Sequence, residues 1–276
     1  MPWLDHAEEL IKRCPGSHCE YGWMRMLRDY ATLASAPVDL HGYLLARERE
    51  AIGRDDAYSY RQQLLTVPLL CQMEGRPAAA QAFLDSRWPQ PTRVRDIFEF
   101  LALSSRLDVF LYQGEADAAY ALLHASTRGL VLKLAGPSVA NHLAYLRARG
   151  AVALYAETRR PELAHEVRRV TRLRTSLPRL SQGLLRALRG CLALADREEA
   201  RAAELLRAGC ADLVACQHDN LAWLVRYRLA QLAGDAGELA RAEAWIRARG
   251  VREPEAWVSV LLPVRPAQNG NGTRNR

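Results

Sequence analysis

The hydrophobic pattern of the chain consists of helical runs that are interrupted at nearly regular intervals. In each case an apolar run ends in a short polar break, and an alanine-rich amphipathic run follows it. The clearest copies are residues 70–84, 109–123 and 229–243, and weaker copies without a glycine are 153–164 and 191–203. Apolar residues that recur every three or four positions are typical of amphipathic α-helices. The pattern therefore predicts pairs of helices joined by short turns.

The spacing of the breaks defines the length of one repeat. The breaks fall near Gly75, Gly114, Arg159, Asp196 and Gly234, which are 39, 45, 37 and 38 residues apart in turn. Glycine suits the left-handed residue that ends a helix, and the alanines after each break let two helices approach closely. Tetratricopeptide (TPR) hairpins need about 34 residues, so these units are predicted to be slightly longer relatives of that repeat.

One segment shows the two-sided pattern of a helix that lies on the surface. Its apolar residues recur at helical spacing, which predicts that they are buried: Leu163, Val167, Val170 and Leu173. The opposite face carries His165, Arg168, Arg169 and Arg172. Pro137 and Pro178 mark positions where helices should start or stop.

We therefore predict an all-α fold, a TPR-like α-solenoid of about six antiparallel helical hairpins. The first hairpin would consist of Tyr21–Ala34 and Val38–Gly53. Because a solenoid buries its core between neighbouring hairpins, residues 1–264 should form one domain. Residues 265–276 are rich in Asn, Gly and Arg, which predicts a disordered tail. The first helices of the pairs should line a concave surface, where we expect a partner protein to bind.

Composition and local sequence indicate where in the cell the protein is located. Apolar residues make up 49% of the 276 residues, which is enough for a well-buried core. The N-terminus lacks the pattern of a signal peptide, and the sequence has no run of roughly 18 apolar residues that would predict a membrane span. Six cysteines scattered over a long chain are typical of reduced thiols. We therefore expect a cytoplasmic protein with no membrane contact.

The basic charge of the chain is concentrated in one segment. The formal net charge is +7, and residues 159–189 hold nine arginines, opposed within the segment only by Glu162 and Glu166. Six of these arginines should be exposed on neighbouring turns and are the candidate partner-binding residues: Arg168, Arg169, Arg172, Arg179, Arg186 and Arg189. Such density of like charge favours an acidic protein partner, although a solvated face of an arginine-rich protein would show the same pattern. Aromatic residues are not interleaved with the arginines, which disfavours nucleic acid.

Four segments carry a resemblance to a known family. They are Cys14-Pro-Gly near the start, residues 46–56, residues 107–114, and the ending 244–263, in which a helix, a glycine, a proline, a short helix and Leu-Pro follow one another. In these segments the chain resembles the C-terminal TPR-like helical-repeat region of large bacterial serine/threonine protein kinases of the eukaryotic-like type, as found in myxobacteria and planctomycetes. The resemblance implies a regulatory or docking role beside a kinase domain.

The catalytic motifs of that family are absent from this sequence. It has no glycine-rich loop, no His-Arg-Asp catalytic loop and no Asp-Phe-Gly motif, so the resemblance does not extend to kinase activity. We predict a non-catalytic protein–protein interaction or regulatory module associated with serine/threonine kinase signalling. Its partner would be an acidic protein or a signalling kinase. The alternative is a nucleic-acid-associated regulator that uses the arginine-rich helical face.

Other clusters of reactive residues have a plainer interpretation. Two groups suggest a metal site: His6, Cys14, His18 and Cys19, and Cys210, Cys216 and His218. Neither group has the paired spacing of structural zinc ligands, and core packing is the favoured role for the thiols. Adjacent carboxylates occur at Glu8-Glu9, Asp55-Asp56 and Glu198-Glu199. Because neighbours on a helix point in different directions, these carboxylates form no acid–base couple. We predict no catalytic residue, no metal and no cofactor.

Overall fold

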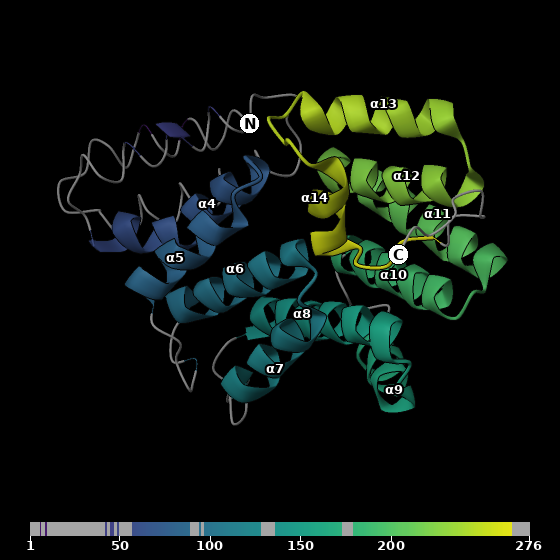
Figure 1. The fold of residues 1–276 in the computed structure, drawn as a ribbon, viewed down its shortest axis with the longest axis horizontal. Helices are drawn as coiled ribbons and strands as arrows, with labels where there is room; N and C mark the ends of the chain where they lie inside the picture. The colour runs from purple at the N-terminus through teal and green to yellow at the C-terminus, as the bar shows by residue number, and fades with distance from the viewer. Residues whose placement is uncertain are drawn as a thin grey trace, which may run out of the picture.

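The computed structural model describes residues 57–88, 94, 97–127, 136–172 and 179–266, and six isolated positions before residue 50. Every regular element among these residues is an α-helix, so the predicted all-α fold is confirmed (Figure 1). The helices in chain order are α4 (Ala57–Met73), α5 (Pro77–Arg87), α6 (Ile97–Gln113), α7 (Ala116–Thr127), α8 (Gly136–Thr158), α9 (Pro161–Val170), α10 (Arg179–Ala195), α11 (Glu199–Ala215), α12 (Asp219–Ala233), α13 (Ala236–Arg247) and α14 (Pro254–Leu261). The predicted first hairpin and most of the predicted tail lie outside the described residues.

Consecutive helices form hairpins. α4 packs against α5, α6 against α7, α8 against α9, α10 against α11, and α12 against α13. The turn of each hairpin contains one residue in the left-handed conformation, and these residues are Gly75, Gly114, Arg159, Arg197 and Gly234. Four of the five predicted breaks are therefore confirmed at the residue that the sequence pattern indicated. The fourth break was expected near Asp196, and its left-handed residue is the next one, Arg197; the backbone N–H of Asp196 donates to Leu192 O (2.9 Å) just after the end of α10.

Arg197 adopts a backbone conformation that favours glycine. Its φ is 62°, where the Cβ atom crowds the following carbonyl at a cost of roughly 1–2 kcal/mol. The exposed side chain makes no hydrogen bond or ion pair with the described part of the chain. We expect Arg197→Gly to raise the free energy of unfolding by roughly 0.5–1 kcal/mol, because the relief of strain exceeds the added entropy of the unfolded chain. Urea unfolding followed by circular dichroism measures this change.

At Gly234 the opposite substitution can be made, from glycine to a residue with a Cβ atom. Its φ is 65°, and a Cβ atom at this position would meet nothing within 4 Å. Gly234→Ala therefore adds backbone strain without a steric clash, and it should lower the free energy of unfolding by about 1 kcal/mol. Shifts of the same sign in the two variants would show that backbone strain does not control the stability of these turns.

Each hairpin contacts the next one in the chain. α6 contacts both α4 and α8, and α8 contacts α10, so the first helices of these pairs lie side by side. The second helix of a pair packs on the first helix of the next pair, as α5 does on α6, α7 on α8 and α11 on α12. Leucines with no exposed area fill these interfaces, among them Leu107, Leu146 and Leu163. One apolar core therefore extends through the described hairpins.

The last helix, α14, follows the hairpins and crosses back over them. It lies between α6 and α12 and also contacts α13 (Figure 1). Just before it, the backbone N–H of Arg252 donates to Met73 O (2.8 Å), and Tyr112 Oη donates to Glu253 Oε2 (3.0 Å). The C-terminal segment therefore joins the first described hairpins to the last one.

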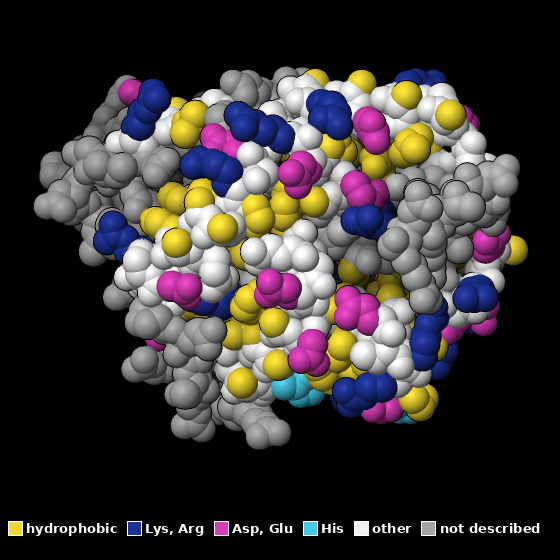
Figure 2. Space-filling view, viewed as in Figure 1, with side chains coloured by type: hydrophobic (Ala, Val, Ile, Leu, Met, Phe, Trp, Pro, Cys, Tyr) yellow, Lys and Arg dark blue, Asp and Glu magenta, His cyan; other side chains and the backbone are white. Residues whose placement is uncertain are grey.

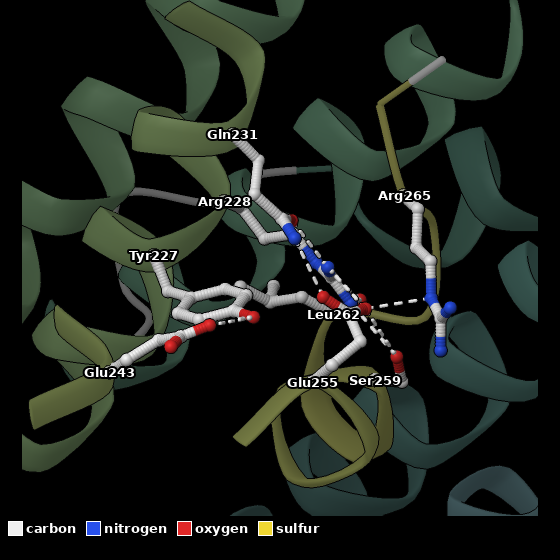
Figure 3. Close-up of polar contacts among 8 residues, drawn as sticks. All are labelled: Tyr227, Arg228, Gln231, Glu243, Glu255, Ser259, Leu262 and Arg265. Carbon is white, nitrogen blue, oxygen red and sulfur yellow. Dashed lines mark hydrogen bonds and ion pairs between the residues drawn. The ribbon is translucent and has the colours of Figure 1, made fainter. Parts of the chain in front are cut away.

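Arg228, on α12, holds α14 in place (Figure 3). Its side chain has no exposed area. The guanidinium nitrogens donate to Leu262 O (3.0 and 3.1 Å), Ser259 Oγ (2.9 Å), Glu255 Oε1 (2.7 Å) and Gln231 Oε1 (2.6 Å). Although burial alone raises it, the pKa of the Glu255 carboxyl is lowered by the adjacent Arg228 guanidinium. A buried arginine with this many acceptors fixes the position of α14.

Candidate functional site

The first helices of the pairs do not present an open surface along their whole length. α14 covers parts of α6 and α12, so the chain itself occupies part of the surface on which a partner was expected. On the face that carries α14, acidic and basic side chains are interspersed over the described part (Figure 2). A local excess of basic charge lies instead where α9, α10 and α11 meet.

Three of the six predicted arginines line one groove. It has a volume of about 370 Å³, and we call it the basic groove. Its lining residues are Arg168, Arg172, Arg189, Leu192, Ala193, Asp196, Glu198, Arg201 and Leu205. Arg201, on α11, was not singled out from the sequence. With four arginines and two carboxylates, the lining carries a net formal charge of +2.

The amphipathic pattern of α9 places two arginines in the groove. Its apolar face is buried as predicted, fully at Leu163 and Val167 and partly at Val170. Arg168 lies on the opposite, exposed face, and Arg172 follows the residue that ends the helix. Leu173, the last predicted apolar position, lies outside the described residues.

Counting only Glu162 and Glu166 against the arginines left out two carboxylates beyond residue 189, which pair with Arg168 and Arg186. Arg168 Nη2 lies 3.2 Å from Asp196 Oδ2, in the turn between α10 and α11. The other oxygen of Asp196 accepts a hydrogen bond from Tyr155 Oη (2.5 Å), which raises the pKa of that phenol. Arg201 likewise lies 2.9 Å from Glu198, three residues before it. Because these contacts are partly exposed to solvent, each contributes little to stability, but they restrict the charge that Arg168 and Arg201 offer a ligand.

Among the residues that the structure describes, Arg172 and Arg189 have no carboxylate that competes with an external ligand. Within the described ranges neither residue forms an ion pair with a carboxylate. Arg172 is exposed and Arg189 is half-buried. A guanidinium presents five N–H donors in a planar fork that matches a carboxylate or a phosphate. The basic groove therefore contains two such groups that an anionic ligand could satisfy.

The other three predicted arginines lie outside the basic groove. Arg186 forms an ion pair with Asp212 on α11. Arg169 and Arg179 are exposed, on α9 and at the first residue of α10. The six arginines therefore do not form one continuous site, because those on α10 point to different neighbours along α11.

A second group of polar side chains lies between α6 and α8. The buried Arg149 forms an ion pair with Asp108 and lies over the ring of Tyr145 (5.2 Å to the centroid). His142 Nε2 lies 3.5 Å from Ser104 Oγ, and burial lowers the pKa of the imidazole to about 4. That separation is long for a hydrogen bond between a nucleophile and its base. Because the members of this cluster contact one another across the two helices, we interpret it as packing.

The thiols that could suggest a metal site are used in packing. Cys210 Sγ donates to Ala222 O (3.7 Å), and Cys216 Sγ donates to Leu213 O (3.4 Å). In the part of the chain that the structure describes, no group of three or more potential ligands is placed to hold a metal ion. Of the other predicted group only His6 is described, and it is exposed on a helix.

Comparison with known proteins adds no relative. No protein-family model, no curated protein and no solved structure matches the chain. Across the described ranges, no helix is long and apolar enough to cross a membrane. The basic groove and the pattern of helical hairpins are therefore the features of this chain that point to a function.

Proposed function

We propose that this chain is a non-catalytic protein-interaction module that binds an acidic segment of a partner protein in the basic groove. The observation that carries the proposal is that Arg172 and Arg189, two guanidinium groups without ion partners among the described residues, line one groove with Leu192 and Leu205. Carboxylates of a partner would satisfy the guanidinium groups. Apolar side chains of the same segment would be buried against the leucines, as in the core of other protein interfaces.

The architecture and the sequence pattern support an interaction role. We propose that the hairpins form a TPR-like α-solenoid, which the predicted N-terminal pair would extend to about six hairpins. Proteins of this kind act through extended binding surfaces. The resemblance to the repeat region of bacterial serine/threonine kinases supports a place in kinase signalling, with a signalling kinase as one candidate partner.

A pair of charge reversals tests the basic groove. The probe is a fluorescein-labelled peptide of glutamate and leucine, mixed with the full chain in a stopped-flow instrument. We expect Arg172→Glu together with Arg189→Glu to lower the association rate constant about tenfold at low salt, because charges at the edge of an interface mainly control association. The difference should shrink in high salt, where these charges are screened.

The matched control reverses the same number of charges outside the groove. Arg169→Glu together with Arg179→Glu changes the net charge equally, and both side chains are exposed and absent from the lining of the groove. This variant should slow association much less, and both variants should keep the circular dichroism spectrum and thermal midpoint of the original chain. Equal slowing in the two variants, or no slowing in either, would contradict the proposal.

The same experiment distinguishes a nucleic-acid ligand from an acidic protein ligand. Asp196 and Glu198 in the lining disfavour a ligand that carries a phosphate at every step. A labelled duplex oligonucleotide should therefore bind more weakly than the acidic peptide at equal salt. If the oligonucleotide binds more tightly and loses affinity in the groove variant, the basic groove recognises phosphates and the proposed function is wrong.

A further inference from the structure

A second groove lies beside the basic groove, on the other side of α11. It has a volume of about 410 Å³ and is formed by α11, α12 and α13. Its charged lining residues are Glu199, Asp235 and Glu238, opposed by Arg207, so its net formal charge is −2. Its other lining residues are alanines and leucines. We call it the acidic groove.

The helical spacing of α11 explains why the two grooves differ in charge. Glu198, Arg201 and Leu205, spaced three and four residues apart, face the basic groove. Ala203 and Arg207, four residues apart, face the acidic groove. The neighbouring carboxylates at 198 and 199 therefore diverge into different grooves, as predicted for adjacent helical positions. Because a helix with its side chains is about 10–12 Å wide, one extended segment could reach both grooves.

We propose that the two grooves form one binding surface for a bipolar segment of a partner protein, which crosses α11. The acidic end of the segment would lie in the basic groove and its basic end in the acidic groove. This proposal rests on the proposed function and specifies the chemistry of its partner. A uniformly acidic segment would be attracted by the first groove and repelled by the second, so opposite charges select both the partner and its direction.

One carboxylate of the acidic groove, Glu199, could bind a cationic ligand in the way that Arg172 and Arg189 could bind an anionic one. Glu199 is exposed and forms no ion pair within the described ranges. Asp235 is less available because its Oδ1 accepts from the backbone N–H of Glu238 (2.9 Å) at the start of α13. Glu238 in turn forms an ion pair with Arg241. On the outer surface of α11, Ala200 and Glu204 are four residues apart and both exposed, so a segment that crosses the helix would pass a small side chain and one further carboxylate.

Three labelled peptides of about ten residues test the bipolar surface, since an extended peptide of this length spans roughly 33 Å. The bipolar peptide has glutamates at one end, alanine and leucine in the middle and lysines at the other end. The second peptide has the same residues with the charges alternating, and the third has glutamates at both ends. Fluorescence anisotropy with the full chain should give the bipolar peptide a Kd at least about tenfold lower than that of its alternating isomer.

Reversal of charge in the acidic groove should reverse the preference. Glu199→Lys together with Glu238→Lys should weaken binding of the bipolar peptide about tenfold and strengthen binding of the doubly acidic peptide. Asp117→Lys together with Glu157→Lys is the matched control. Both control residues are exposed and line neither groove. Asp117, like Glu199, lies in the first turn of its helix. The control should keep the order of the three affinities.

The outcomes separate this inference from the proposed function. Equal affinity for the bipolar and alternating peptides would overturn the bipolar surface, and so would an unchanged bipolar affinity in the Glu199 and Glu238 variant. In either case the proposed function stands if binding of the doubly acidic peptide still depends on Arg172 and Arg189. If binding of all three peptides is independent of those two arginines, both proposals are wrong.

Discussion

Arg228→Met should lower the free energy of unfolding by about 3–5 kcal/mol, the usual cost of breaking a buried ion pair by removing one partner. The arginine side chain has no exposed area. Without it, Leu262 O and Ser259 Oγ lose their donors, and Glu255 loses its buried cation. The thermal midpoint should fall by roughly 10 °C in a chain of this size. Because Arg228 holds α14, hydrogen exchange should accelerate first at the amides of residues 255–261.

Arg226→Met is the matched control, since it removes an arginine two residues away on the same helix. Arg226 is half-buried, and its guanidinium carbon lies 4.7 Å from the centroid of the Trp223 ring. Loss of this cation–π contact should cost about 0.5–1 kcal/mol. Arg228→Lys should destabilise the chain by an amount between those of the two methionine variants, because an ammonium keeps the charge but cannot reproduce the planar fork of the guanidinium. Equal destabilisation by the two methionine variants would contradict the role of Arg228 in holding α14.

The hairpins could be predicted because their turns carry local signals. Gly75, Gly114 and Gly234 each occupy the left-handed position that the sequence pattern predicted at the breaks. The position of α14 could not be predicted in this way. Its buried residues, such as Val258, follow a helical pattern that specifies burial but not the partner. The helix lies against α6, far away in the sequence, and only the three-dimensional path of the hairpins brings the two together.

The basic groove was predictable only as far as local helical periodicity determines it. The period of α9 correctly places Arg168 on an exposed face. Its pairing with Asp196 depends on how two hairpins are aligned, and no local pattern contains that information. Arg201 could not be placed in the groove in this way. It is as far from the turn residue Arg197 as the groove residue Ala193 is, but the sequence placed the break near Asp196 and so did not give this alignment.

The close contact between α10 and α11 depends on glycines in both helices, Gly183 and Gly190 on α10 and Gly209 on α11. A Cβ atom on Gly209 would lie 2.8 Å from the backbone oxygen of Gly183 and 3.1 Å from the backbone nitrogen of Ala187. Both contacts are with backbone, so the helices themselves must move apart to accept a methyl group. This separation would also disturb Leu206 and Leu213, which are fully buried in the same interface. Gly209 is therefore required by packing.

Gly209→Ala should lower the free energy of unfolding by about 1–3 kcal/mol, as expected for an overpacked core. This direction is opposite to intrinsic helix propensity, by which alanine is better than glycine by about 1 kcal/mol. Gly237→Ala on α13 supplies the comparison, because that glycine is exposed and its added Cβ would lie 3.4 Å from its nearest neighbour, Asp235 Oδ1. It should raise the free energy of unfolding by up to about 1 kcal/mol, as propensity alone predicts. Urea unfolding of both variants measures the difference, and stabilisation by both would show that α10 and α11 tolerate a wider separation than their contact at Gly183 implies.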